Sequence, residues 1–304
     1  MATSLHSLLE RKKPSAWSLF LSNPVVFLSK TLYSWRKIPV EPTALSSQVT
    51  TVVCTSDTHN SQPNVPEGDV LLHAGDLTQS GSHAEIQATV DWLNTLPHEH
   101  KVVIAGNHDV FLDPDYGLST GTNHKRDTIE WGDVTYLRDR STTLRCSGGR
   151  KIKIYGSPWT PRCGNWAFQH HRTDDIWRDT IPSDTDILIT HGPPKGYLDL
   201  SNNLGCQFLL EELWRLRNKP RLHVFGHIHE GYGREWALFD GLQRSYDDVM
   251  RSNGGGLKLL KMAYQFVVSY LRPKRGNQAT LMVNAAMVGG LRDELRRQPV
   301  VVSF

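Results

Sequence analysis

The sequence predicts an α/β fold in which two β-sheets are flanked by helices. Five short apolar runs are typical of buried strands, and each is followed at once by a polar motif. Segments with helical periodicity lie between these runs. A chain of 304 residues is long enough to bury the core of one large α/β domain. The five runs are residues 52–54, 70–72, 102–104, 187–189 and 222–225.

Helices are predicted where apolar residues recur with a period of about 3.6. In residues 83–96, Ile86, Val90 and Leu93 follow this spacing and predict a crossover helix between parallel strands. Residues 207–217 predict a second helix, which Pro220 ends. Residues 126–131 are compatible with a short helix.

The remaining elements are strands and one long loop. Residues 134–137 and 151–155 are expected to form strands of a second sheet layer, and residues 280–285 and 300–304 to form closing strands. Residues 113–125 are rich in glycine and aspartate, which predicts a loop over the site.

The polar motifs are expected to meet at one place. Because ligands of an open α/β sheet collect at the carboxyl ends of its strands, motifs directly after strands should converge there. They offer carboxylate, amide and imidazole ligands without thiolate, a set that suits Mn, Fe, Zn or Mg rather than a structural cysteine-type zinc site. The motifs are Asp57-Thr58-His59, Gly75-Asp76, Gly106-Asn107-His108-Asp109, His191-Gly192 and Gly226-His227-Ile228-His229.

The order of these motifs resembles that of the calcineurin-like metallophosphoesterase superfamily. The resemblance implies a four-layer αββα sandwich with a metal site at the carboxyl edges of the strands. It also implies two divalent metal ions, for which Mn is our first choice and Fe, Zn or Mg are alternatives. By the same resemblance, Asp57, His59 and His229 hold one metal, Asn107, His191 and His227 hold the other, Asp76 bridges both, and His108 is a non-ligand histidine beside the scissile phosphate.

A closer resemblance covers most of residues 50–236. Residues 103–108, 154–161, 190–194 and 223–233 look like the small metallophosphoesterase-domain-containing family. That family is more similar to cyclic-nucleotide phosphodiesterases than to protein phosphatases.

The expected chemistry is hydrolysis of a phosphoester. Two divalent metals about 3.5–4 Å apart share a hydroxide and lower its pKa towards neutrality. The carboxylate of Asp76 can give one oxygen to each metal, and the hydroxide attacks phosphorus in line. His108 assists the leaving oxygen. Asp109 and Glu230 are candidates for orienting the histidines.

Two departures from the Ser/Thr protein phosphatases favour a phosphodiester. Their second motif reads G-D-x-V-D-R-G, whereas Gln79 and Ser80 stand here at the second aspartate and the arginine, and Ala105 precedes Gly106 in place of another arginine. Without two guanidiniums the site neutralises less charge, which suits a singly charged diester.

We therefore expect a small nucleotide-like or cyclic phosphodiester as the substrate. The alternatives are a phosphomonoesterase or protein phosphatase, or a weakly active metal-binding scaffold. Four residues could offer aromatic faces to a base, although core packing is the commoner role for such side chains: Trp159, Trp166, Phe168 and Tyr197.

Charge divides the chain into three parts. Residues 1–40 carry six Lys/Arg against one acid, and residues 251–275 carry six against none, whereas residues 41–250 have a net charge of −9. An acidic core suits a site that gathers divalent cations. We expect a basic, partly amphipathic extension over residues 1–47 and a metallophosphoesterase domain over residues 48–304, interrupted by an insertion at about 236–277.

The two basic segments carry helical patterns. Residues 257–271 confine their polar positions to a narrow stripe, and a similar pattern follows Pro24. We expect peripheral contact with anionic membranes through residues 1–40 and 251–275. Packing on the domain or on a second subunit is the alternative. Binding to a nucleic-acid duplex is not expected.

The cellular location is predicted from the cysteines and from the length of the apolar segments. Four widely separated cysteines with no C-x-x-C pair favour a reducing compartment, so we expect a cytoplasmic protein, with membrane-peripheral attachment as described. No signal peptide and no membrane span are predicted, because the apolar stretches are short or interrupted.

Overall fold

The computed structural model describes residues 15–37, 49–119, 128–146, 149–200, 204–251, 255–271, 278–290 and 292–304. The chain forms two compact units. Unit 1 comprises residues 1–38 and 238–275, and unit 2 comprises residues 39–237 and 276–304. The N-terminal extension and the insertion thus contribute to one unit, an association that the sequence did not predict. The domain boundaries at 47 and at 236–277 stay predictions.

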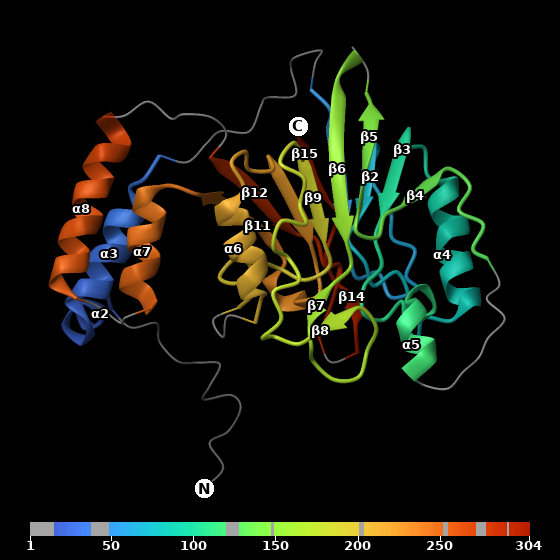
Figure 1. Cartoon of the computed structure of the whole chain (residues 1–304), viewed down its shortest axis with the longest axis horizontal. Coiled ribbons are helices and arrows are strands. Elements are labelled where there is room, and N and C mark those ends of the chain that lie inside the picture. Colours follow the sequence, from blue (N-terminus) through green and yellow to red (C-terminus); the bar gives the residue numbers. More distant parts are fainter. Residues whose placement is uncertain are drawn as a thin grey trace, which may run out of the picture. The chain divides into compact units, whose positions relative to one another are not determined.

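Unit 2 contains a five-stranded sheet in the order β15-β1-β2-β3-β4 (Figure 1). Strands β1 to β4 run parallel, and β15 joins β1 antiparallel at the edge. Parallel strands buried on both faces are expected to be almost continuously apolar, as these are. The strands are β1 (Thr51–Thr55), β2 (Val70–His73), β3 (His100–Val103), β4 (Val134–Tyr136) and β15 (Val300–Ser303).

A six-stranded sheet in the order β11-β12-β10-β9-β6-β5 forms the other half of unit 2. Its central strands β12, β10, β9 and β6 are parallel, and β5 pairs antiparallel with β6. The strands are β5 (Arg140–Arg145), β6 (Lys151–Ser157), β9 (Ile187–Thr190), β10 (Leu222–Phe225), β11 (Gly233–Leu238) and β12 (Ala279–Asn284).

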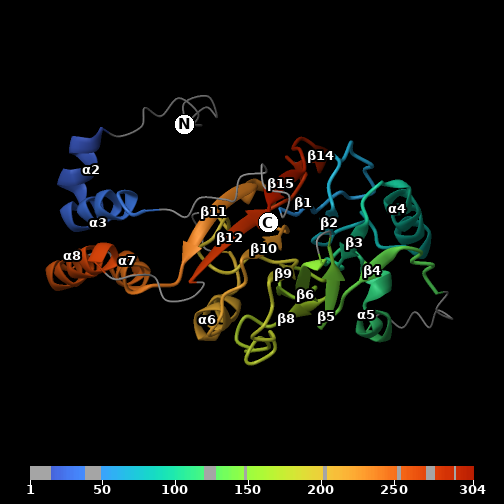
Figure 2. The same ribbon diagram turned by 90° about the horizontal axis from the view of Figure 1, so that it is seen from above.

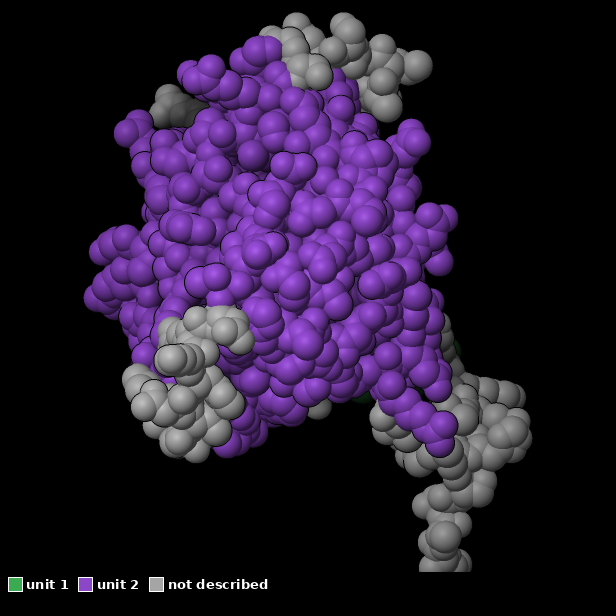
Figure 3. Space-filling model, turned by 90° about the vertical axis from the view of Figure 1, so that its right-hand side faces the viewer, with its two compact units in different colours: residues 1–38, 238–275 green, residues 39–237, 276–304 purple. Residues whose placement is uncertain are grey.

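The two sheets face each other across one apolar core, and helices cover their outer faces. Alternate residues of each strand meet between the sheets, for example Val52 and Leu72 from the first and Ile154 and Ile189 from the second. Helix α4 (His83–Thr95) covers the outer face of the first sheet. Helix α6 (Gln207–Arg215) lies beside the second sheet in both ribbon views (Figures 1 and 2). The predicted α/β sandwich is confirmed, and Figure 3 shows one face of unit 2 in space-filling form.

Helix α4 illustrates how the sequence fixes an element. Ser82 caps its N-terminus and Glu85 bonds back to Ser82, a reciprocal capping box that satisfies two free backbone N–H groups. Ile86, Val90 and Leu93 then form the buried stripe. The helix ends before Pro97, which could not continue it.

Short elements complete unit 2 around the carboxyl ends of the strands. The two-stranded pieces are β7 (Thr160–Pro161) with β8 (Gln169–His170), and β13 (Val288–Gly289) with β14 (Glu294–Leu295). The single turns and short helix are η1 (Val110–Leu112), α5 (Pro114–Ser119) and η3 (His229–Gly231).

Three expectations need correction. Residues 134–136 form β4 beside β3 in the first sheet rather than in the second layer, because they add to its open edge in parallel register. The expected loop at 113–125 contains helix α5, which begins at Pro114, a residue favoured in a first turn; its residues 120–125 lie outside the described residues. The short helix expected at 126–131 is not formed over residues 128–131, the part that the structure describes.

The described residues of unit 1 form four helices. Helix α3 contacts α2, α7 and α8, and α7 contacts α8. The buried Arg36 guanidinium joins the N-terminal segment to the insertion, 2.7 Å from the carboxylate of Asp240 and 3.0 Å from Gln243. No helix among the described residues is long and apolar enough to cross a membrane. The helices are α2 (Ala16–Ser22), α3 (Pro24–Ser34), α7 (Gly241–Arg251) and α8 (Gly256–Leu271).

Candidate metal centre

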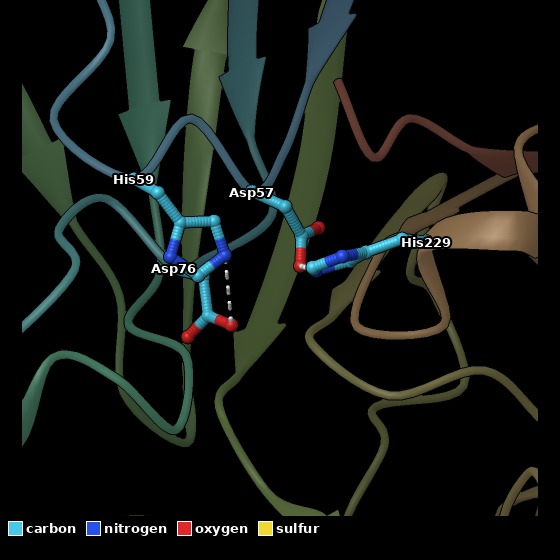
Figure 4. Close-up of side chains that lie close together, drawn as sticks. All are labelled: Asp57, His59, Asp76 and His229. Atoms are coloured by element: carbon cyan, nitrogen blue, oxygen red, sulfur yellow. Dashed lines mark ion pairs between the residues drawn. The ribbon is translucent and has the colours of Figure 1, made fainter. Parts of the chain in front are cut away.

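Residues that follow five different strands meet at the carboxyl edge of the sheets. One group with mutually close ligand atoms contains Asp57, His59, Asp76 and His229, and a second contains Asp76, His191 and His227. Within each group the ligand atoms lie within 4.8 Å of one another. Asp76 belongs to both groups, so one carboxylate lies where two ions could share it. Figure 4 shows the first group, with side chains from separate loops pointing toward one another.

Close contacts hold the centre together. The Nε2 atom of His191 lies 3.2 Å from the Oδ2 atom of Asp76, and the Nε2 atom of His59 lies 3.8 Å from the same oxygen. On the other side, the Nε2 atom of His229 lies 3.2 Å from the Oδ1 atom of Asp57. The amide oxygen of Asn107 lies 3.1 Å from His191 Nε2. All seven predicted ligands are thereby brought into one cluster.

The backbone of the ligand loops adopts an unusual conformation. Asp57, His59, Asp76 and His227 have φ values of 51°, 43°, 51° and 64°. Residues other than glycine rarely adopt this left-handed region, and such strain persists where the surrounding structure enforces it, often at functional sites. This left-handed backbone conformation lets each side chain leave the end of its strand toward the edge where the ligands meet.

Two motif glycines are required by close approach. A Cβ atom on Gly226 would lie 1.9 Å from the Oδ2 atom of Asp57, and one on Gly106 would lie 2.3 Å from the Oδ1 atom of Asp76. The neighbouring N–H groups then reach these carboxylates: His227 N–H donates to Asp57 at 3.1 Å, and His108 N–H donates to Asp76 at 2.8 Å. The glycines therefore let the main chain fix the two acids.

Burial and charge set the protonation of the centre. Burial lowers the pKa of His227 to about 4, which leaves a neutral imidazole that can bind a cation. Burial acts the same way on His191, but the charges of Asp76 and Asp57 outweigh it and raise the pKa to about 9. The proton on His191 balances buried negative charge, a role that a divalent cation would take over when it displaces that proton.

His59 gives the most direct test of whether the residues fit a metal. Both of its ring nitrogens are buried, and neither has a hydrogen-bond partner among the described residues. Buried polar atoms are nearly always paired, so an orphaned imidazole beside two carboxylates fits a missing cation. Its pKa is lowered, because burial outweighs the attraction of Asp76, and the neutral ring is the ligand form. The donor set therefore fits divalent metal.

His108 is held at the rim of this cluster and is absent from both ligand groups. Its Nδ1 atom lies 2.7 Å from the backbone carbonyl oxygen of Gln79, and its ring packs edge-on against His59. The indole of Trp166 stacks on the imidazole of His108, with ring centroids 4.1 Å apart. These contacts hold the ring, and its Nε2 atom has no hydrogen-bond partner in the described part of the chain.

Two residues expected to orient histidines have other partners. Asp109 accepts hydrogen bonds from the N–H groups of Leu77, Thr78 and Gly106, so it ties two ligand loops together. Burial and the charge of Asp76 raise its pKa to about 6. Glu230 accepts from Arg297 at 2.8 Å. The expectation that either carboxylate contacts an imidazole is not met.

The sequence missed the groups that do orient the imidazoles. The carbonyl of Ala74 lies 2.8 Å from Nδ1 of His191, and Asp293 lies 3.4 Å from Nδ1 of His229. With the carbonyl of Gln79, they hold rings whose other nitrogen faces the centre. A backbone carbonyl leaves no sequence signal, and Asp293 stands outside the motif-bearing segments.

The four aromatic candidates differ in their surroundings. Phe168 and Tyr197 are buried, so core packing accounts for them. Trp159 donates from Nε1 to Asp139 at 3.0 Å. Trp166 is 40% exposed and contacts His108, so it can meet a substrate at this rim.

Together, the sandwich and the shared-carboxylate centre are typical of a metal-dependent phosphoesterase. The model of the calcineurin-like phosphoesterase family matches residues 50–231, and the chain belongs to this family. The resemblance proposed from the motifs is confirmed at the level of the family.

Relatives extend the match beyond the motifs. Metallophosphoesterase domain-containing protein 1 of Homo sapiens is 41% identical over 208 residues, which cover 60% of this chain and 62% of that protein. A protein of Emericella nidulans named "Probable rhamnogalacturonate lyase C" is 42% identical over 304 residues, covering 99% of this chain but 29% of that protein. A 3',5'-cyclic-nucleotide phosphodiesterase of Nostoc sp. is 24% identical over 56% of this chain and 59% of its own length. The chain thus spans less than two thirds of each of these relatives.

Proposed function

We propose that the chain hydrolyses phosphodiesters, with a small nucleotide-like or cyclic diester as substrate. The observation that carries this proposal is the charge at the rim of the centre. Ser80 stands where a phosphate-gripping arginine would be, and its hydroxyl donates to Glu85 at 2.8 Å. Four hydrogen-bond donors nearby outweigh partial burial and lower the pKa of Glu85 to about 2, so this carboxylate is anionic.

A negative rim discriminates by substrate charge. A phosphomonoester carries nearly two negative charges at neutral pH, and a diester carries one. Glu85 also accepts a hydrogen bond from Asn60, the residue that follows the predicted ligand His59 in the chain. Repulsion by a nearby carboxylate costs a dianion more than a monoanion. Ala105, which is buried, stands where the protein phosphatases have a second arginine, so this position adds no positive charge either.

The residues of the chain have distinct roles in this proposal. Asp57, His59 and His229 would hold one ion, Asn107, His191 and His227 the second, and Asp76 would bridge them. When bound, a divalent pair supplies an activated water and neutralises charge on the phosphate. Mn is the first choice because the ligands combine hard oxygens with imidazoles.

His108 would handle the leaving group. Its Nδ1 atom donates to the Gln79 carbonyl, so Nε2 is the ring atom at which a proton can be taken up and given. That proton can move to the leaving oxygen as the P–O bond breaks. Trp166, stacked on His108, offers an aromatic face for a flat leaving group such as a nucleoside base.

The names of the relatives support this proposal to different degrees. The Nostoc protein is named for cyclic-nucleotide hydrolysis, the reaction class proposed here. The lyase name belongs to a protein of which this chain matches 29%, and the aspartate and histidine cluster favours phosphoester hydrolysis for the matching part.

The proposal is tested by comparing bis(p-nitrophenyl) phosphate with p-nitrophenyl phosphate, each with and without Mn²⁺. We expect Mn²⁺-dependent turnover with the higher kcat/KM for the diester. Ser80→Arg should shift the preference towards the monoester, because it adds the missing guanidinium. Ser80→Ala is the matched control and should leave the preference unchanged. A higher kcat/KM for the monoester in the native chain would refute the proposed specificity, and no turnover of either would favour the scaffold alternative.

A further inference from the structure

Helix α8 in unit 1 carries an apolar stripe on its exposed face. Its members are spaced by three and four residues, which places them along one side of the helix. Their exposed fractions range from 54% to 83%, high values for large apolar side chains in a folded unit. The stripe consists of Leu257, Leu260, Tyr264, Val267 and Leu271.

The opposite face of α8 is turned into the unit, although it is partly polar. Met262 is fully buried, and Gln265 and Ser269 are partly buried. Gln265 lies against α7, since a Cβ atom on Gly241 would come within 2.4 Å of its Oε1 atom. The packing thus leaves an apolar stripe of the helix without cover from the described residues of unit 1.

Aromatic residues and a lysine lie at the C-terminal end of this helix. Tyr270 donates from its hydroxyl to the carbonyl oxygen of Trp35 at 2.8 Å, and the Nζ atom of Lys37 lies 5.0 Å from the Tyr270 ring centre. The side chain of Trp35 is 63% exposed. Tryptophan and tyrosine with flanking lysine are typical of residues at the boundary between lipid and water.

The charge of the two units identifies the kind of surface that would cover the stripe. Unit 1 contains 13 Lys/Arg against four acids, a net charge of +9, whereas the remaining residues contain 21 against 27, a net charge of −6. Helix α8 contains two lysines and no acid. Such a charge attracts an anionic surface and opposes pairing with a second, equally charged copy.

We propose that unit 1 docks on anionic membranes, with the stripe of α8 inserted among the lipid headgroups. At 1.5 Å per residue the 16-residue helix is about 24 Å long, so it suits a position in the plane of the interface. The catalytic unit would then act on substrates near a membrane surface. The proposal is independent of the phosphodiester specificity.

Vesicle co-sedimentation with the full chain tests the proposal. The chain should pellet with phosphatidylserine-containing vesicles at low salt, and pelleting should fall with added salt and with purely phosphatidylcholine vesicles. Leu260→Glu and Val267→Glu should each weaken binding on the order of tenfold or more. Each removes apolar area that the membrane would bury and adds a negative charge that anionic lipid repels. Leu295→Glu, at an exposed leucine of unit 2, is the matched control and should bind like the native chain.

Three results would overturn the proposal. The first is a native chain that stays in the supernatant with anionic vesicles at low salt. The second is equal binding to uncharged vesicles. The third is a native dimer, seen by light scattering, that Leu260→Glu converts to a monomer, since the stripe would then belong to a contact between copies. Circular dichroism establishes that each variant is folded, and diester turnover in solution should be unchanged in all of them.

Discussion

The indole ring of Trp166 stacks on the imidazole of His108 with an interplanar angle of 27°. The carbonyl of Gln79 binds the same imidazole at Nδ1. One side chain and one backbone group, from segments almost 90 residues apart in sequence, therefore hold the proposed leaving-group histidine. No carboxylate among the described residues takes this role.

The stacking predicts a measurable effect of Trp166. Trp166→Ala should raise KM for nucleotide-like diesters by about tenfold, close to the roughly 1.4 kcal/mol at the upper end for an aromatic pair. Trp166→Phe should recover most of that loss, because it keeps an aromatic face. Steady-state kinetics with a cyclic nucleotide and with the methyl ester of p-nitrophenyl phosphate distinguish the roles. An equal loss of kcat for both substrates, with KM unchanged, would mean that Trp166 only positions His108.

The role of His108 predicts a loss of rate without a loss of metal. His108→Ala should keep both ions and reduce kcat by about 10²–10⁴-fold, the usual size of an acid–base contribution. The loss should be smaller for p-nitrophenol than for a poor leaving group such as an alcohol, because p-nitrophenolate needs less protonation. If the two losses were equal, His108 would act on the phosphoryl group by electrostatic binding instead.

The shared position of Asp76 predicts unequal effects on metal content. Asp76→Ala should abolish dinuclear binding, because this carboxylate belongs to both ligand groups. Asn107→Ala should empty mainly the second site. Elemental analysis counts the ions, and Asp184→Ala serves as a control, since this exposed carboxylate pairs with Lys153. Two equivalents of metal retained by Asp76→Ala would rule out the bridging role.

Gly226 is predicted to be irreplaceable even by alanine. The added Cβ atom would lie 1.9 Å from Asp57, so the His227 loop or the carboxylate must move. Gly226→Ala should therefore lower metal affinity and the thermal unfolding midpoint. At Gly256, the first residue of α8, a Cβ atom meets nothing within 4 Å, so Gly256→Ala should be neutral or slightly stabilising. Unaltered metal binding by Gly226→Ala would show that the loop yields easily.

The strands and the convergence of the motif residues could be predicted because each carries a local signal. Val52, Val70 and Val102 begin apolar runs that only a buried strand explains well, and the polar motifs begin within a few residues of the strand ends. Chain direction then places the motifs at a common edge. That step needs only the order of the motifs and the rule that ligands collect at the carboxyl ends of the strands in an open α/β sheet.

The elements that were missed lack such signals. Strand β5 (Arg140–Arg145) is mostly exposed and polar, so it forms only because β6 offers its edge. Helix α7 (Gly241–Arg251) is strongly amphipathic, but its apolar residues are few and matter only once α3 and α8 cover them. The contact of Arg36 with Asp240 joins segments more than 200 residues apart, which no local pattern indicates.

A titration of the metal-free chain with Mn²⁺ tests the central claim most directly. Hydrolysis of bis(p-nitrophenyl) phosphate would be followed as Mn²⁺ is added, with bound metal counted in the same samples. One catalytic centre that shares Asp76 between two ions predicts that activity rises and saturates at two equivalents per chain. Full activity at a single equivalent, or two bound equivalents with no diester hydrolysis, would contradict the account.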